Sequence, residues 1–371
     1  MIEWIYNSQL EKSSGYEDVM DELKSYTKEN YLALDEYGKG NMIEEIFNIY
    51  RSKNIFPITY YNEEGILKEI NSCVDKDIKW NENNVLDFKF NQGQSLCRFL
   101  FPNMQDVMIK NVKNNSPYFK FHDDIKLKKA IKFCLEHKSV KSPVVPSAIK
   151  DGLEMLGGNV ATNFKSMNAK ALYERYTPKN GIIYDFACGY GGRMLGALTS
   201  KNNYKYFGVE PNTETFNNLN KLGSYIEKAT GRSNIFKIYQ QGSEDFRTSK
   251  GEYVDFAFSS PPYFNLEVYS NEETQSYIKF PTLNEWLEGY VRDTIKNIYF
   301  MLKKDCHYAV NIADFKIGKK EVEFVNEWIR ISEEEGFTFV EEIHMKLQNR
   351  RGNGNGENKR GKKEGIFVFK K

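Results

Sequence analysis

The chain has 371 residues, of which 40% are hydrophobic and 28% are charged, and its formal net charge is +1. This composition is typical of a soluble globular protein with one large domain or two ordinary ones. No apolar run reaches the roughly 20 residues that a membrane span needs, and the near-neutral balance removes the simplest argument for a nucleic-acid partner.

The N-terminal segment and the cysteines indicate the compartment. The chain begins MIEWIYNSQLEKSS, without a basic stretch followed by an apolar one, so we expect no secretory signal. The five cysteines are odd in number and never form a CxxC pair, which favours a reducing, cytoplasmic location. The four histidines do not cluster with cysteines or carboxylates at ligand spacing, so no metal site is expected.

Residues 1–150 are predicted to form a separate, mainly helical region. Amphipathic patterns cover residues 35–58 and 123–139, and aromatic residues and asparagines are spread between them. The segment SVKSPVVPSAIK, residues 139–150, contains two prolines and is predicted to be the junction. The second domain is therefore expected to span residues 151–371.

From residue 181 onward, strand and helix patterns alternate. Strands are predicted at residues 181–189, 204–211, 234–242, 254–260 and 307–314, and helices at 191–200, 215–231, 284–302 and 321–336. Two further strands, 337–347 and 365–371, follow without a helix between them. This order predicts an α/β fold with a mostly parallel sheet, covered on both faces and closed by an antiparallel hairpin.

A glycine-rich turn joins the first predicted strand to its helix, in the sequence YDFACGYGGR. Gly189, Gly191 and Gly192 allow a ligand to approach the backbone, and the following helix presents unpaired N–H groups. The second strand ends in Glu210, 25 residues after Asp185, where dinucleotide folds place an acid that binds ribose hydroxyls. A nicotinamide dinucleotide and S-adenosylmethionine both fit this pattern. The loop is not GxGxxG, and no GK[ST] follows as in an ATP-binding loop.

The fourth strand ends in FSSPPYFNLEVY, residues 258–269, at the same edge of the predicted sheet. Pro261 and Pro262 restrict the backbone and remove two N–H donors, so the segment offers carbonyl acceptors. An amino group could donate one N–H to the Pro261 carbonyl and the other to the Ser260 side chain. Tyr263 provides a ring face on which a planar base could stack.

SPPY, with FACGYGGR and GVEP before it, resembles the amino-methyltransferases that act on DNA. The resemblance covers residues from about 158 to 371 and implies a Rossmann-like class I methyltransferase domain, with a seven-stranded sheet and S-adenosyl-L-methionine as cofactor. It implies catalytic roles for Ser260, Pro261, Pro262 and Tyr263. The residues that the resemblance assigns to the cofactor are Asn163, Phe164, Lys165, Asp185, Ala187, Cys188, Gly189, Gly191, Gly192, Glu210, Pro211, Ser243 and Glu244. The family more often has Asp at the position of Ser243 and Glu244.

The resemblance also implies the reaction and its partner. A base flipped out of DNA would be methylated on its exocyclic amine. The serine in SPPY favours cytosine N4 over adenine N6. DNA is the implied partner, with a cognate restriction endonuclease where the enzyme belongs to a restriction-modification system. Target recognition is expected in residues 1–150, helped by residues 264–283 and by the basic segment 346–363, with contacts from Phe264, Arg350, Arg351, Lys359 and Arg360.

Other functions remain open at the level of the sequence. An RNA methyltransferase or a protein-glutamine methyltransferase could share the fold and a Pro-Pro-aromatic motif. A nicotinamide-dependent oxidoreductase could use the same glycine loop, but it would leave SPPY unexplained. A DNA-binding module without catalysis is the remaining alternative, and the intact motifs argue against it.

Overall fold

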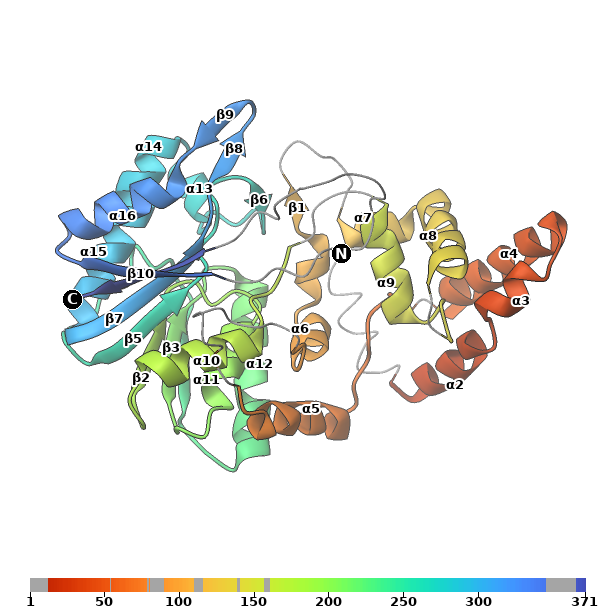
Figure 1. Ribbon diagram of the computed structural model, residues 1–371, viewed down its shortest axis with the longest axis horizontal. Helices are drawn as coiled ribbons and strands as arrows, with labels where there is room; N and C mark the ends of the chain where they lie inside the picture. The colour runs from red at the N-terminus through yellow and green to blue at the C-terminus, as the bar shows by residue number, and fades with distance from the viewer. Residues whose placement is uncertain are drawn as a thin grey trace. The chain divides into compact units, whose positions relative to one another are not determined.

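The computed structural model describes residues 13–53, 55–78, 80, 90–109, 116–138, 141–156, 161–344 and 365–371, which form two compact units (Figure 1). The first unit comprises residues Met1–Gly65 and Arg98–Thr162, and the second comprises Ile66–Cys97 and Asn163–Lys371. The chain therefore passes between the units three times. Helices α5 (Glu63–Asp75) and α6 (Gln94–Leu100) contain the first two of these points.

Helices dominate the described part of the first unit, as the sequence predicts. The elements are α2 (Ser13–Lys24), α3 (Lys28–Leu32), α4 (Glu36–Lys53), the 3-10 helix η1 (Pro102–Asp106), the short strand β1 (Met108–Ile109), α7 (Pro117–His122), α8 (Asp124–His137) and α9 (Pro146–Met155). Asp123 caps α8 by accepting the Lys126 N–H at 3.0 Å. The apolar faces of α4 and α8 bury Ile46 and Ile131.

The second unit is built around a seven-stranded sheet in the order β10-β11-β7-β5-β2-β3-β4. Its strands are β2 (Ile182–Asp185), β3 (Lys205–Val209), β4 (Phe236–Tyr239), β5 (Val254–Ser259), β7 (Leu302–Ile312), β10 (Thr338–His344) and β11 (Gly365–Lys370). The first five are parallel, whereas β11 pairs antiparallel with both β7 and β10. This confirms the predicted fold, including the C-terminal hairpin.

Helices cover both faces of this sheet (Figure 1). On one face lie α10 (Ser166–Tyr176), α11 (Gly192–Leu198) and α12 (Thr213–Thr230). On the other lie α14 (Leu283–Trp286), the π-helical turn η2 (Leu287–Val291), α15 (Arg292–Met301) and α16 (Phe324–Glu334). All six residues of the central strand β5 are buried, which explains why its sequence VDFAFS does not alternate between polar and apolar residues.

Residues 66–97 belong with the sheet rather than with the N-terminal helices, which differs from the single boundary expected near residue 150. The reason is a long-range contact. Lys170 on α10 is 1% exposed, and its ammonium donates to the carbonyl oxygens of Cys73, Val74 and Lys76 at 2.9, 3.1 and 2.8 Å. A buried ammonium needs such acceptors, so the C-terminal end of α5 is held against α10.

The remaining elements of the second unit are short. The strand β6 (Glu267–Val268) and the helix α13 (Ser276–Lys279) lie between β5 and α14. The strands β8 (Phe315–Ile317) and β9 (Lys320–Val322) form a hairpin between β7 and α16 that the sequence analysis did not predict. None of the helices in the described parts of the chain combines the length and apolar character that crossing a bilayer requires.

Candidate active site

The sheet reverses its winding between β2 and β5. Numbered in chain order, the strands run 3-2-1-4-5-7-6, so connections leave strands 1 and 4 in opposite directions. In open α/β sheets, ligands bind at the carboxyl ends of the strands beside this reversal. The glycine loop follows β2 and SPPY follows β5, and the two segments touch, because the Ser259 hydroxyl donates to the Ala187 carbonyl at 3.1 Å.

The glycine loop has the backbone conformation that its sequence predicts. Gly189 and Gly191 have φ of 54° and 74°, a left-handed region that other residues enter only with strain. Gly191 is also the N-cap of α11, so the loop leads directly into the unpaired N–H groups of the helix. A Cβ on Gly189 would meet no described atom nearer than 3.9 Å, so the space over this residue is open.

Asp185 supports this loop from beneath. Its side chain is 0% exposed, and the Arg193 guanidinium donates to both carboxylate oxygens, at 2.8 and 3.3 Å. The Tyr206 hydroxyl and the Ala187 N–H also donate to it, at 2.8 and 3.2 Å. The carboxylate that the resemblance assigns to the cofactor therefore has its acceptor positions occupied by protein donors. Cys188, beside it, is buried, and burial raises the pKa of its thiol.

Glu210 lies at the end of β3, next to the loop. Its two carboxylate oxygens accept the N–H groups of Gly189 and Asn212, both at 3.0 Å. Burial raises the pKa of Glu210 to about 7, against the lowering effect of these two hydrogen bonds. Each oxygen keeps a second lone pair, so the carboxylate can still accept two hydroxyl groups. Pro211, the next residue, accepts the Thr274 hydroxyl at 3.3 Å through its carbonyl.

The segment 163–165 packs directly on the glycine loop. The Asn163 amide donates to the Tyr190 carbonyl at 2.9 Å. A Cβ on Gly192 would lie 2.1 Å from the Phe164 carbonyl oxygen, so only glycine permits this approach. Phe164 is buried edge-on against Phe258, and Lys165 is half-buried as the N-cap of α10. The predicted segment and the predicted loop therefore form one structural unit.

Ser243 and Glu244 follow β4 and are held by one face of the helix η2–α15. The Ser243 hydroxyl lies 2.6 Å from the Thr294 hydroxyl, and the Asn297 amide donates to the Ser243 and Glu244 carbonyls at 2.8 and 3.3 Å. Tyr290, on the π-helical turn of the same face, is buried, and burial and the nearby Glu244 charge raise its pKa. Sequence reasoning missed this helix face. Its only signal was the polar residues at 290, 294 and 297, spaced for one side of a helix.

The SPPY segment lies beside the glycine loop at the end of β5. Ser260, Pro262 and Tyr263 are partly exposed, whereas Pro261 is buried. The Tyr263 ring is half-buried, with its edges toward Phe315 and Phe324.

Phe264, which the sequence analysis assigned to the substrate, is 5% exposed and packs on Trp286 in the core. Its φ of 48° is strained for an aromatic residue and turns the chain sharply after SPPY. The ring is therefore a structural anchor of that turn.

The chain after SPPY returns across the ends of β3 and β4. The Glu272 carboxylate accepts the Thr213 N–H at 3.2 Å and the Thr213 hydroxyl at 2.9 Å, at the start of α12. The Tyr269 ring lies 6.5 Å from that of Tyr190 in the glycine loop, and the Tyr269 hydroxyl donates to Glu267. Lys279 forms ion pairs with Glu244 and Asp245. We call residues 265–280 the crossing segment.

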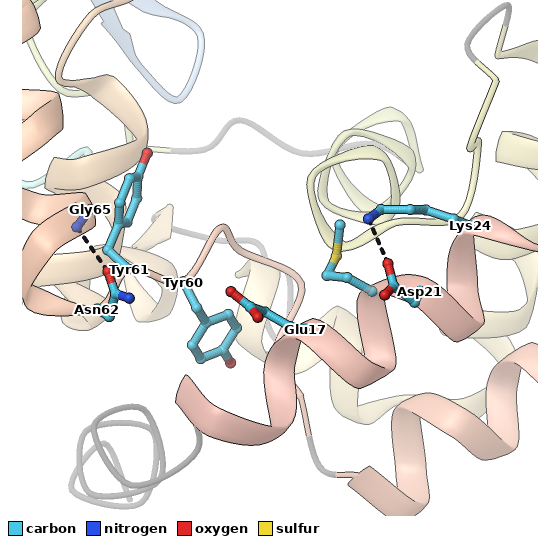
Figure 2. Close-up of a pocket in the computed structure, with 8 residues that line it drawn as sticks. Glu17, Asp21, Lys24, Tyr60, Tyr61, Asn62 and Gly65 are labelled. Carbon is cyan, nitrogen blue, oxygen red and sulfur yellow. Dashed lines mark hydrogen bonds and ion pairs between the residues drawn. The ribbon is translucent and has the colours of Figure 1, made fainter.

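Two parts of the predicted nucleic-acid surface need separate mention. Arg350, Arg351, Lys359 and Arg360 lie outside the described residues. In the first unit, a pocket of about 450 Å³ is lined by α2 and residues 60–65 (Figure 2). Glu17 and Asp21 lie on its wall, and Lys24 is paired with Asp21 at 2.8 Å, so this pocket is unsuited to a phosphate group.

No protein-family model and no curated protein matches the sequence. Solved structures do. A TehB-like SAM-dependent methyltransferase from Corynebacterium glutamicum has 14% identity and a TM-score of 0.34, over 57% of this chain and 90% of that one. TrmN from Thermus thermophilus has 15% identity and a TM-score of 0.37, over 56% and 48%. Geranyl diphosphate C-methyltransferase from Streptomyces coelicolor A3(2), solved with S-adenosyl-L-homocysteine, has 11% identity and a TM-score of 0.37, over 55% and 78%.

Proposed function

We propose that this chain is an S-adenosylmethionine-dependent methyltransferase that modifies the exocyclic amine of a base in DNA. The observation that carries the proposal is the contact between the glycine loop and the SPPY strand at the reversal of the sheet, made by Ser259 and Ala187. It brings a nucleoside-binding loop beside a segment suited to an amine. A nicotinamide enzyme would need the loop but not the prolines.

The residues present fit this cofactor. Glu210 keeps free lone pairs for two ribose hydroxyls, and the open space over Gly189 allows the ligand to approach the backbone. Glu244 has one buried carboxylate oxygen, Oε2, without a hydrogen-bond partner among the described residues, which suits an amino group. Asp185 acts indirectly in this proposal, because it holds the loop through Arg193 rather than touching the ligand.

The bound cofactor would supply a methyl group on a sulfonium centre, and the chain supplies the geometry. The lone pair of an aromatic amine is delocalised into its ring, so the amine is a weak nucleophile. Hydrogen bonds from the amine to the Pro261 carbonyl and the Ser260 hydroxyl would favour a tetrahedral nitrogen whose lone pair can attack. Orientation of this kind contributes up to about 7–11 kcal/mol in well-ordered systems. The sequence places no covalent nucleophile in the motif.

Tyr263 would bind the face of the base. Its ring is held by edge contacts with Phe315 and Phe324, and its half-buried position leaves part of it accessible. Stacking on an aromatic residue is worth about 1–3 kcal/mol per base. That gain would offset part of the few kcal/mol that removing a base from the duplex costs.

Serine in the first position of the motif favours cytosine N4 in this proposal, with adenine N6 second. A neutral, short hydroxyl leaves most of the polarisation of the amine to the Pro261 carbonyl. RNA methylation and protein-glutamine methylation are the alternatives within the same fold. Both would use the same loop and the same acceptors, so the polymer has to be identified by experiment.

The experiment uses labelled S-adenosylmethionine with duplex DNA, RNA and protein as separate acceptors. We expect label in DNA, and N4-methyldeoxycytidine after digestion to nucleosides and mass spectrometry. Pro261→Ala should lose transfer and keep cofactor affinity, whereas the control Pro281→Ala, at an exposed position, should keep both. Binding of NADH in place of S-adenosylmethionine in calorimetry would exclude the proposal. Methylated deoxyadenosine alone would change only the base.

A further inference from the structure

Two buried polar atoms at the edge of the candidate site have no hydrogen-bond partner among the described residues. One is the Glu244 Oε2 acceptor, and the other is the Gln275 Nε2 donor on the crossing segment. Gln275 is only 6% exposed. Buried groups of this kind are paired in nearly all native proteins, so an unpaired acceptor and an unpaired donor in one region indicate a ligand.

The contacts of the crossing segment bring these two atoms to the same place. Before Gln275, the Thr274 hydroxyl donates to the Pro211 carbonyl at the end of β3. After it, Lys279 pairs with Glu244 at the end of β4. Gln275 is the N-cap of α13 and Lys279 is its last residue, so they are four positions apart on one helix face, about 5.4 Å along the axis.

The Glu244 carboxylate is held in place rather than free to find another donor. A Cβ on Gly242 would lie 2.3 Å from Oε2 and 2.6 Å from Oε1, so the carboxyl group occupies the space that a side chain at position 242 would fill. Lys279 engages Oε1, and Asn297 holds the backbone. Only Oε2 is left to accept.

We propose that Gln275 and Glu244 together read the amino-bearing edge of the cofactor's adenine. The adenine 6-amino group donates to Glu244 Oε2, and an adjacent ring nitrogen, N1 or N7, accepts from Gln275 Nε2. This inference rests on the proposed function, and it adds a specificity residue from the segment that also carries SPPY.

The pattern selects adenine against its deaminated form. Hypoxanthine has a carbonyl oxygen where adenine has the amine, and that oxygen would face the Glu244 carboxylate. It also has N1–H in place of the N1 acceptor. A site built to hydrogen-bond one arrangement of donors and acceptors rejects the reverse arrangement strongly, because its own buried groups are then left unpaired.

The test measures binding of S-adenosylhomocysteine and its 1-deaza, 7-deaza and inosine analogues by calorimetry. In the wild type, we expect one deaza analogue and the inosine analogue to bind at least about tenfold more weakly, or about 1.4 kcal/mol. Gln275→Met, which keeps the side-chain length and removes the donor, should weaken S-adenosylhomocysteine by a similar factor and leave that same deaza analogue unaffected. The control Gln240→Met removes an exposed amide that bonds Thr213 and should change none of the four affinities.

Failure of this inference is distinguishable from failure of the proposed function. If the wild type does not bind S-adenosylhomocysteine, the proposed function falls and the reading of adenine falls with it. If the wild type binds it but holds both deaza analogues equally well, only the role of Gln275 is refuted. That comparison needs no variant, so it stands even where Gln275→Met fails to fold. Equal weakening of all ligands by Gln275→Met also refutes the role.

Discussion

Cofactor affinity should depend on pH through Glu210. Burial raises the pKa of this carboxyl to about 7, so below pH 7 it is mostly protonated in the free protein. Two ribose hydroxyls that donate to the carboxylate would favour its ionised form and lower its pKa in the complex. Binding at low pH therefore requires loss of a proton, and affinity should fall as the pH falls below 7.

The size of the effect follows from the shift. If the pKa returns to its ordinary value of about 4.5 in the complex, affinity should be nearly constant above pH 8 and fall about tenfold per pH unit between pH 6.5 and 5. At pH 5.5, about 3% of the free protein carries the ionised carboxylate, so binding should be about 30-fold weaker than at pH 8, or about 2 kcal/mol. The Gly189 and Asn212 N–H groups bond Glu210 and are present in both states, so they do not contribute to the difference.

Calorimetry with S-adenosylhomocysteine from pH 5.5 to 8, in buffers of different ionisation enthalpy, measures both the affinity and the proton released. Glu210→Gln should weaken binding and flatten the profile. A 2′,3′-dideoxy analogue of the ligand should give a flat profile with the wild type, because it has no hydroxyls to donate. An equally steep profile with that analogue, or in Glu210→Gln, would refute the assignment of Glu210 to the ribose.

Three further outcomes are expected. Tyr263→Ala should slow single-turnover methylation by about 1–3 kcal/mol in barrier while cofactor affinity stays within about twofold, and Tyr263→Phe should restore the rate; an unchanged rate in the alanine variant would remove Tyr263 from base binding. Asp185→Asn leaves the buried Arg193 charge without its partner and should lower the free energy of unfolding in urea by about 3–5 kcal/mol, against less than about 1 kcal/mol for Asp77→Asn in the exposed pair with Lys201. Equal destabilisation of these two variants would contradict the supporting role of Asp185. Shortening residues 350–363 should flatten the slope of log affinity for DNA against log salt by about 0.9 for each phosphate that the shortened chain no longer neutralises, and an unaltered slope would exclude this segment from the DNA surface.

The sheet could be predicted from the sequence because its signals are local. Each buried strand is an apolar run of a few residues, and each helix carries its own stripe and its own stop, such as Gly231 after α12. The glycine loop, Glu210 and SPPY also have local signatures. Parallel strands place their carboxyl ends at one edge, so order along the chain was enough to bring these motifs together.

The features that were missed depend on contacts between distant residues. Nothing near Lys170 in sequence indicates that it donates to the carbonyl oxygens of Cys73, Val74 and Lys76. Gln275 lies in a polar stretch whose composition resembles an ordinary loop, and its importance depends on the ion pair between Lys279 and Glu244. Asp185 looks like a ligand-binding acid until the positions of Arg193 and Tyr206 are known.

The interleaving of the two units has a consequence for how the protein is made and dissected. Neither unit comes from one continuous stretch of chain, so during synthesis residues 66–97 emerge long before Lys170, to which they are joined. The sheet unit can be completed only when its last strand, β11, has been translated. A fragment cut at residue 151 would retain every motif and yet leave the Lys170 ammonium buried without its acceptors. Functional dissection of this protein should therefore keep residues 66–97 attached to the catalytic fragment, by linking them through a short connector in place of residues 98–162.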